Sequence, residues 1–514
     1  MNHWIVAPVL LPAMLAALMV MAMRHDLVLQ RVFSVAGSVA LVAIAAGLYW
    51  LASDGTIEVY KLGNWQPPFG IVLVLDRLSA TMLLLTSGLG LGVVLYAIGS
   101  GWDGRGWHFH PLFSFQLMGI NGAFLTGDAF NLFVFFEVLL IASYGLMIHG
   151  GGGMRLRSGL QYVVMNLAGS TLFLFAMGTL YAVTGTLNMA DMAVKVRSLA
   201  PGDEALMMVG ATLLLIVFAI KAAAFPVQFW LPGTYANAPA PVAALFAILT
   251  KVGAYAILRM YTLVFGADVP AVGSYFSELL MASALVSLVV GSIGVLGAKQ
   301  LPRQAAFAVL ASMGTLLIAI GLNTSAGTGA ALFYLVHSTL AAAALFLAID
   351  LVRDAQGPTT RAPGGLVATL FFIAAIAVAG MPPLSGFLGK LLILDASRNT
   401  PHMVLIWSVI LVTSLMLIVG FTLRGSRYFW KPLDPNWHDP GNFDEDGNPV
   451  PALPLNPLAL AAACIPPALM VIFTLAAGPA MRELEATAQQ LRARTPYVEA
   501  VLGPGAFATP PAEE

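Results

Sequence analysis

Charged side chains are scarce in this sequence, where Asp, Glu, Lys and Arg together make up 10% of the 514 residues. Soluble domains carry about 25% charged residues, so this chain cannot cover a water-exposed globular surface with charge. Hydrophobic residues make up 59% of it. Apolar runs of about 20 residues, the length that a helix needs to cross a bilayer, recur from end to end. These features predict a membrane protein and exclude a soluble one.

The sequence also has almost no net charge and almost no cysteine. A formal net charge of -1 gives no basic field for nucleic acid and no acidic excess for a polycation. The single cysteine, Cys464, excludes internal disulfides and any cysteine-ligated cluster or zinc site supplied by this chain alone. No flavin, iron–sulfur or nucleotide motif is legible, and we therefore expect neither a cofactor nor a bound metal.

Fourteen membrane spans are predicted from the hydrophobic runs, which makes the fold class an all-α polytopic membrane protein. A polar stretch from about 425 to 455 is typical of a loop, and residues 481–494 form a short amphipathic stretch. Lys and Arg are concentrated in alternate loops, which the positive-inside rule assigns to the cytoplasm, so both termini are expected outside it. The predicted spans are 4–23, 29–51, 71–98, 111–127, 129–149, 160–184, 207–230, 241–265, 276–298, 303–322, 328–352, 364–396, 403–424 and 456–478.

Two of these spans are interrupted by proline. The segment Lys221 to Pro232 breaks the seventh span, and the segment Gly380 to Lys390 breaks the twelfth. Proline removes a backbone donor and frees a carbonyl, which a membrane helix tolerates only where protein or water satisfies it. Broken helices at corresponding positions of two halves indicate an ion site between inverted repeats, and these two breaks are five helices apart.

Glu137 lies near the centre of the apolar fifth span. Insertion scales put a charged side chain there at about 2.5 to 3.5 kcal/mol, so it should face a partner or water. A carboxyl in such a place can exchange protons near neutral pH. The alternative is a static ion pair that clamps two helices. Asp76 and Arg77, at the head of the third span, are interpreted as a local pair at the membrane interface.

Two lysines extend this polar set. Lys221 lies one turn before the first break, and Lys251 lies in the middle of the eighth span. Burial disfavours the charged form of lysine, so each can pass a proton on rather than merely hold a charge. With Glu137 they predict a half-channel on the fifth, seventh and eighth helices. The alternative for either lysine is snorkelling of its ammonium group to the interface.

His337, in the eleventh span, and Lys390, just past the second break, are the corresponding carriers of the second half. Histidine titrates nearest to neutral pH and therefore suits a proton relay. The alternative for His337 is a packing role, and the alternative for Lys390 is an interfacial anchor. Together with the first three side chains, these two predict one path through the middle of the membrane.

Four motifs, in this order, resemble the antiporter-like subunits shared by Mrp antiporters and respiratory complex I. The likeness covers about residues 70 to 425. The first and third motifs are most similar to the D-type subunit of the Mrp/Pha/Mnh multisubunit monovalent cation/proton antiporters. The motifs are Gly127-Asp-Ala-Phe-Asn-Leu-Phe-Val-Phe-Phe-Glu137-Val, Lys221 with Phe225-Pro226 and Trp230-Leu-Pro232, Leu249-Thr-Lys251-Val-Gly253, and Pro382-Pro-Leu-Ser-Gly-Phe-Leu-Gly389-Lys390.

This resemblance implies two inverted five-helix repeats, in helices 4–8 and 9–13, with helices 7 and 12 broken. It also implies a hydrated axis through Glu137, Lys221, Lys251, His337 and Lys390. The implied division of the chain is 1–98 for the first three helices, 99–265 for the first repeat, 266–425 for the second repeat, and 426–514 for the polar loop, the last helix and the tail.

Two positions depart from the pattern of the relatives. Ala341 stands where many relatives carry a lysine one turn after the histidine of helix 11, and Phe246 stands near where some carry a histidine. The second half-channel is therefore expected to depend on His337, the adjacent hydroxyl groups and water to reach Lys390.

The function that the resemblance implies is proton translocation in a multisubunit Na⁺ or K⁺/H⁺ antiporter, coupled to cation efflux, with Glu137 and Lys221 as the switching pair. The expected partners are other small and large membrane subunits, protons, Na⁺ or K⁺ and the lipid bilayer, with no nucleic acid. The expected location is the cell inner (plasma) membrane, as a multi-pass protein. One alternative is a proton-pumping membrane subunit of an NADH:quinone oxidoreductase or a membrane hydrogenase. Another is a purely structural assembly subunit, in which apolar residues could replace Glu137, Lys221 and Lys390 without loss of function. In none of these cases is this chain expected to be the enzyme itself.

Overall fold

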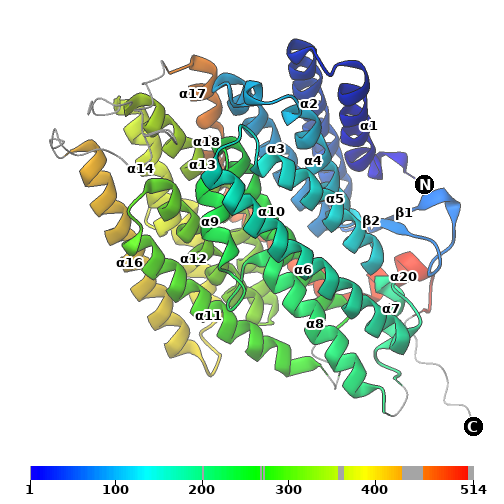
Figure 1. Ribbon diagram of the computed structural model, residues 1–514. Coiled ribbons are helices and arrows are strands. Elements are labelled where there is room, and N and C mark those ends of the chain that lie inside the picture. The colour runs from blue at the N-terminus through cyan, green and yellow to red at the C-terminus, as the bar shows by residue number, and fades with distance from the viewer. Residues whose placement is uncertain are drawn as a thin grey trace, which may run out of the picture.

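The computed structural model describes residues 2–199, 202–266, 269, 272–356, 364–430 and 455–506. In these residues helices dominate and run side by side as one bundle (Figure 1). Eleven of the described helices are long and apolar enough to cross a bilayer, and Ala7–Ala22 and Gly365–Ala379 are shorter apolar helices. The predicted polytopic helical fold is confirmed, whereas the number of fourteen spans stays a prediction.

The elements follow one another in a simple order. Up to residue 263 they are α1 (Ala7–Ala22), α2 (Leu27–Ala52), β1 (Glu58–Lys61), β2 (Val72–Leu75), α3 (Arg77–Gly99), α4 (Phe109–Leu125), α5 (Ala129–Met147), α6 (Gly153–Thr184), α7 (Met189–Lys195), α8 (Glu204–Ala222), α9 (Trp230–Asn237) and α10 (Ala240–Leu263). After it they are α11 (Gly273–Gly297), α12 (Leu301–Gly321), α13 (Ser325–Gln356), α14 (Gly365–Ala379), α15 (Ser385–Ala396), α16 (Met403–Phe429), α17 (Pro457–Ala463), α18 (Ile465–Leu475), α19 (Ala477–Arg492) and α20 (Arg494–Leu502). Short 3-10 helices cover His3–Ile5, Leu62–Asn64 and Trp102–Arg105.

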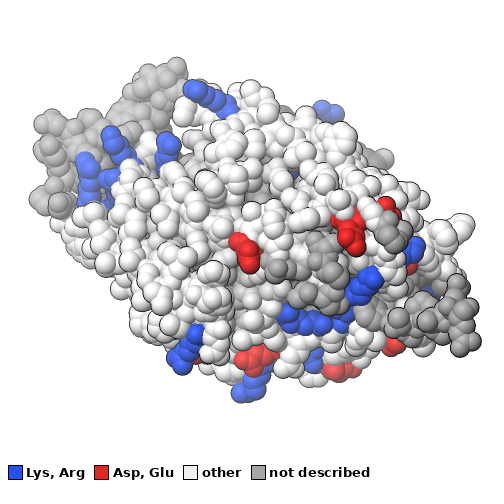
Figure 2. Space-filling model, turned by 90° about the horizontal axis from the view of Figure 1, so that it is seen from below, with Lys and Arg blue, Asp and Glu red and all other residues white. Residues whose placement is uncertain are grey.

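The helices differ in how much of their surface other helices cover. Every residue in the most apolar stretch of α10 is buried, and α12 and α13 are almost as enclosed. Helices α2 and α16 instead leave most of their apolar residues uncovered, as expected of helices that face lipid. The face of the molecule seen in Figure 2 is mostly uncharged. A charged group on α10 or α13 is therefore surrounded by protein.

The predicted third span contains a strand as well as a helix. Val72–Leu75 is fully buried but forms β2, which pairs antiparallel with β1, with Glu58 opposite Leu75. The helix begins only after Asp76, whose carboxylate accepts a hydrogen bond from Ser79 N at 2.8 Å. A side chain that caps a helix in this way fixes its first turn, so the apolar residues before it cannot continue the helix.

The first predicted break lies between α8 and α9, and a distant helix stabilises it. The unwound segment begins at Ala223, which has φ +52°. Phe225 N donates to Ser287 Oγ on α11 at 2.8 Å, and Ser283 Oγ on the same helix donates to the Phe225 carbonyl. Trp230 Nε1 donates to the Ile220 carbonyl at the end of α8. Protein side chains therefore satisfy the backbone groups that the break frees.

Replacing Ser287 by Ala should weaken this arrangement, because Phe225 N then loses its acceptor. We expect a loss of about 1 kcal/mol in the free energy of unfolding. Thermal unfolding of the purified protein measures this effect. Ser292→Ala is the matched control, since this buried serine of α11 donates only to Leu288 O of its own helix. Equal effects of the two substitutions would contradict the prediction.

The second predicted break lies between α14 and α15. Helix α14 ends at Ala379, and the capping residue Gly380 has a φ of +77°, a left-handed value that suits glycine. Ser385 N, at the start of α15, donates to Thr474 Oγ1 on α18 at 2.9 Å. A helix from another part of the chain thus stabilises this break, as α11 stabilises the first one.

One end of the bundle, here called the hairpin end, carries β1, β2, α7 and α20 (Figure 1). The predicted amphipathic stretch 481–494 is confirmed as most of α19, which packs across α13, α10 and α3 at this end. The predicted local pair of Asp76 and Arg77 is wrong. Asp76 pairs with Arg259 of α10, and Arg77 pairs with Glu483 of α19. Neighbouring residues at the start of a helix point in different directions, so each meets a different element.

The opposite end, here called the Trp102 end, contains loops that the positive-inside rule assigns to the cytoplasm. The guanidinium groups of Arg105 and Arg155 lie 3.7 Å and 5.3 Å from the centre of the Trp102 ring. Arg31 Nε lies 2.6 Å from Asp103 Oδ2. Burial raises the pKa of the Asp103 carboxyl, but hydrogen bonds from His110 and Arg31 outweigh this effect and hold its pKa below the usual value. The arginines of three predicted cytoplasmic loops thus meet at one end.

The predicted polar loop from 425 to 455 begins later than expected, since α16 continues to Phe429. Residues 431–454 of that loop lie outside the described residues. The last predicted span is divided into α17 and α18 at Cys464, and Pro466 and Pro467 follow in the first turn of α18. A proline in the first turn of a helix needs no hydrogen-bond acceptor, which explains why α18 restarts there.

Candidate functional site

The five predicted carriers lie on five helices that, together with α6, pack as an unbroken series. Helix α5 packs against α6, α6 against α8, α8 against α10, α10 against α13, and α13 against α15. Four of the side chains are buried, with 4%, 0%, 1% and 6% exposed for Lys221, Lys251, His337 and Lys390, and Glu137 is partly buried. Such burial argues against snorkelling of the lysines. Their role as carriers stays a prediction.

Glu137 and Lys221 are connected through α6 rather than directly. The Glu137 carboxylate accepts a hydrogen bond from Ser170 Oγ, and the Lys221 ammonium donates to Asn166 Oδ1 at 3.0 Å. Asn166 and Ser170 are one turn apart, so their side chains share a face of α6. The two charged groups do not form an ion pair in the described part of the chain. The predicted switching pair is therefore bridged by two neutral side chains.

Neither Asn166 nor Ser170 is among the residues predicted from the sequence. Their signal was a polar residue at every fourth position of an apolar helix, in the series Tyr162, Asn166 and Ser170. Tyr162 also connects α6 to α5, because its hydroxyl lies 2.8 Å from Ser143 Oγ. Such residues stand out less than Glu137, since uncharged polar side chains commonly form hydrogen bonds between membrane helices.

Lys251 occupies the most enclosed position of the five. Its amine is fully buried and has no hydrogen-bond partner among the described residues. Gly253 allows α10 to come close to the end of α8, because a Cβ at this position would lie 2.9 Å from the Lys221 carbonyl carbon and 2.6 Å from Ala222 N. The backbone of α10 next to Lys251 therefore packs directly against the backbone of α8 at Lys221.

His337 and Lys390 are bound to the two sides of the second break. His337 Nδ1 lies 2.9 Å from Ser385 Oγ at the start of α15, and its Nε2 lies 3.2 Å from the Ala377 carbonyl near the end of α14. The Lys390 ammonium donates to the Ala379 carbonyl at 2.8 Å and to Ser414 Oγ at 2.9 Å. His337 thus contacts both sides of the break, and Lys390 satisfies a carbonyl group that the break frees.

A small cavity adjoins His337 where the sequence has Ala341. It measures about 10 Å³ and is also lined by Ser312, Tyr334 and Ser338, which is about the minimum space for one water molecule. The polar groups around it can bind such a water. The cavity therefore lies where the sequence predicts that water takes the place of a lysine side chain.

Comparison with known proteins identifies the family. Residues 126–417, more than half of the chain and a segment that includes all five predicted carriers, match the family described as NADH:quinone oxidoreductase/Mrp antiporter, TM. The chain belongs to this family. It is 39% identical to the D-type subunit of a probable K(+)/H(+) antiporter from Rhizobium meliloti (strain 1021), over 98% of each chain. It is 36% identical to the D-type subunit of the Na(+)/H(+) antiporter of Alkalihalophilus pseudofirmus, over 98% of this chain and 100% of the relative.

Solved structures of related assemblies agree with the fold of this antiporter-family chain. A chain of the Mrp complex from Dietzia sp. DQ12-45-1b has a TM-score of 0.86 and 29% identity, and the match covers 98% of this chain and 100% of that one. A chain of respiratory complex I from Thermus thermophilus has a TM-score of 0.77 and 23% identity, over 95% and 99%. The latter shares the fold alone. The predicted family and its polytopic architecture are confirmed.

Proposed function

We propose that this chain carries protons in a multisubunit Na⁺ or K⁺/H⁺ antiporter of the inner membrane, and that proton flow through it drives cation efflux through the assembled complex. The carriers are Glu137, Lys221, Lys251, His337 and Lys390, in this order. The observation that supports this proposal most is their burial along one unbroken series of packed helices. The names of the full-length relatives, which are D-type antiporter subunits, support it independently.

The bridge through α6 suits proton movement better than a direct ion pair does. A buried ion pair with good geometry holds both charges in place, and breaking it is costly. Asn166 and Ser170 each have a donor and an acceptor, so they can form hydrogen bonds with either protonation state of Lys221 and Glu137. When Lys221 gives up its proton, Asn166 can donate to the neutral amine. The pair thus stays coupled without being locked.

The middle of the path depends on water. Lys251 has no protein hydrogen-bond partner among the described residues, so its amine needs a water molecule to take up or pass on a proton. A water molecule in the cavity next to His337 supplies a polar neighbour in the second half. A membrane potential of 100 mV contributes about 2.3 kcal/mol per charge moved across it, which is enough to bias transfer along such a path.

We also propose that residues 99–265 and 266–425 are the two inverted repeats.

Transport measurements on everted membrane vesicles that contain the assembled complex test this function. A pH-sensitive dye should report proton movement when Na⁺ or K⁺ is added to vesicles that were first acidified by respiration. The purified complex should contain other membrane subunits and should not reduce quinone with NADH. Because a chain of complex I has the same fold, the experiment also tests the redox alternative. Quinone reduction by the complex, without any cation-dependent dye signal, would overturn the antiporter proposal.

A further inference from the structure

Arg492, at the end of α19, carries a positive charge that no acidic side chain of the described residues pairs with. Its Nη2 donates to Asn323 Oδ1 at 2.8 Å. Its Nε is buried and has no hydrogen-bond partner among the residues that the structure describes. Burial and the neighbouring charge of Arg494 lower the pKa of Arg492 below its ordinary value. A partly buried charge without a counter-charge is costly, so an anion bound beside this guanidinium would stabilise it.

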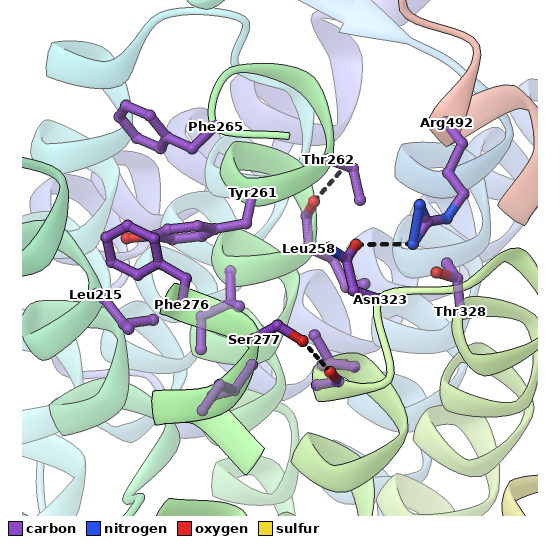
Figure 3. A pocket seen from close by; sticks show the side chains of 14 residues that line it. Leu215, Leu258, Tyr261, Thr262, Phe265, Phe276, Ser277, Asn323, Thr328 and Arg492 are labelled. Atoms are coloured by element: carbon purple, nitrogen blue, oxygen red, sulfur yellow. Dashed lines mark hydrogen bonds between the residues drawn. The ribbon is translucent and has the colours of Figure 1, made fainter. Parts of the chain in front are cut away.

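Arg492 lies at one side of a pocket at the hairpin end (Figure 3). The opposite side consists of aromatic side chains, namely Tyr261, Phe265 and Phe276. The polar groups of Asn323 and Thr328 lie on the same side as the guanidinium. The pocket therefore has a cation on one side and an apolar wall on the other.

The apolar wall continues onto a surface that faces outward. Phe276 and Ser277 of α11 line the pocket, and the adjacent Tyr275 and Leu279 of the same helix are 46% and 40% exposed, with the exposed carboxylate of Glu278 between them. Apolar side chains this exposed on a membrane-spanning helix face lipid or another subunit. A ligand with an anionic head and a hydrocarbon tail matches the pocket and this surface together.

We propose that Arg492 binds the phosphate group of an anionic phospholipid, whose acyl chain lies along the exposed side of α11. A guanidinium binds phosphate oxygens with two parallel N–H donors, and the unpaired Nε with Nη2 offers that geometry. The enclosed space, about 30 Å³, is too small for a whole headgroup, so one phosphate oxygen enters it to reach Nε and the rest of the headgroup lies across the mouth of the pocket. Free inorganic phosphate satisfies the same donors but leaves the aromatic wall uncovered. The site is independent of the proton path.

Thermal unfolding of the purified complex, stripped of lipid in detergent, tests this site. The probes are short-chain phosphatidylglycerol, short-chain phosphatidylcholine and inorganic phosphate, each titrated separately. Phosphatidylglycerol should raise the unfolding temperature of the wild type by several degrees, and more than the other two probes. Arg492→Gln should weaken the apparent affinity for phosphatidylglycerol by about tenfold, since it removes a charge-assisted hydrogen bond.

Two further variants separate the site from general surface charge. Arg482→Gln changes an exposed arginine of the same helix, outside the pocket, and should leave the titration unchanged. Arg492→Lys keeps the charge without the paired donors and should lie between the wild type and Arg492→Gln. An equal response to inorganic phosphate would replace the lipid with a free anion as the ligand. Wild-type affinity in Arg492→Gln, or an equal loss in Arg482→Gln, would overturn the site altogether.

Discussion

Replacing Glu137 by Gln should reduce cation/proton exchange by at least about 100-fold, the lower range for loss of a group that transfers protons. Glutamine keeps the size of the side chain and can still accept a hydrogen bond from Ser170, so assembly should be normal. It cannot bind and release a proton. Exchange is measured in everted vesicles with a pH-sensitive dye, and assembly is measured by the amount of intact complex after purification.

Two variants define what the Glu137 result means. Glu278→Gln changes an exposed carboxylate of α11 and should leave exchange unchanged. Asn166→Leu removes the acceptor for the Lys221 ammonium but no titratable group, so exchange should fall by a smaller factor, about tenfold, which is the rate effect of losing one hydrogen bond of about 1.4 kcal/mol. Full exchange by correctly assembled Glu137→Gln complexes would show that this carboxyl carries no proton.

Replacing Arg259 by Met should destabilise the protein by about 3 to 5 kcal/mol, the range for breaking a buried ion pair. Arg259 and Asp76 are each 3% exposed, and Arg259 Nη2 lies 2.9 Å from Asp76 Oδ1. The guanidinium also contacts the Tyr255 hydroxyl at 3.1 Å. Without it, the Asp76 carboxylate stays buried with no counter-charge. Thermal unfolding in detergent measures the loss.

A second substitution tests whether the unpaired charge causes that loss. Asp76→Asn removes the charge but keeps an oxygen that can cap α3, so the double variant should recover a large part of the stability. Arg398→Met is the control, because its pair with Asp395 is 63% and 60% exposed and exposed pairs contribute about 0 to 1 kcal/mol. A double variant no more stable than Arg259→Met alone would assign the loss to packing.

The features that the sequence predicts correctly depend on the bilayer. Apolar runs of membrane length define the helices, because lipid leaves a spanning chain few other structures. Prolines in two of these runs predict the two breaks for the same reason. Glu137 is conspicuous because a carboxyl in an apolar run has a high energetic cost. These arguments require no knowledge of which helices are neighbours.

The features that the sequence does not predict depend on neighbours. Asn166 and Ser170 are ordinary polar residues until α6 is placed between α5 and α8. The partner of Asp76 is 183 positions away, so no local pattern indicates it. The strand Val72–Leu75 is as apolar as the helix that follows, and hydrophobicity alone does not separate the two.

The dependence of each break on a distant helix has a consequence for biosynthesis. The ribosome delivers the chain from its N-terminus, so Phe225 enters the membrane before Ser283 and Ser287 exist to bind it. Ser385 N lacks its hydrogen-bond acceptor for longer, since Thr474 lies 89 positions further along the chain. Until the final hydrophobic segment is inserted, the Ser385 amide lacks its acceptor on Thr474 and needs another hydrogen-bond partner, such as water. A nascent chain released before residue 474 therefore lacks a finished second half, although every residue proposed to carry protons has already been synthesised.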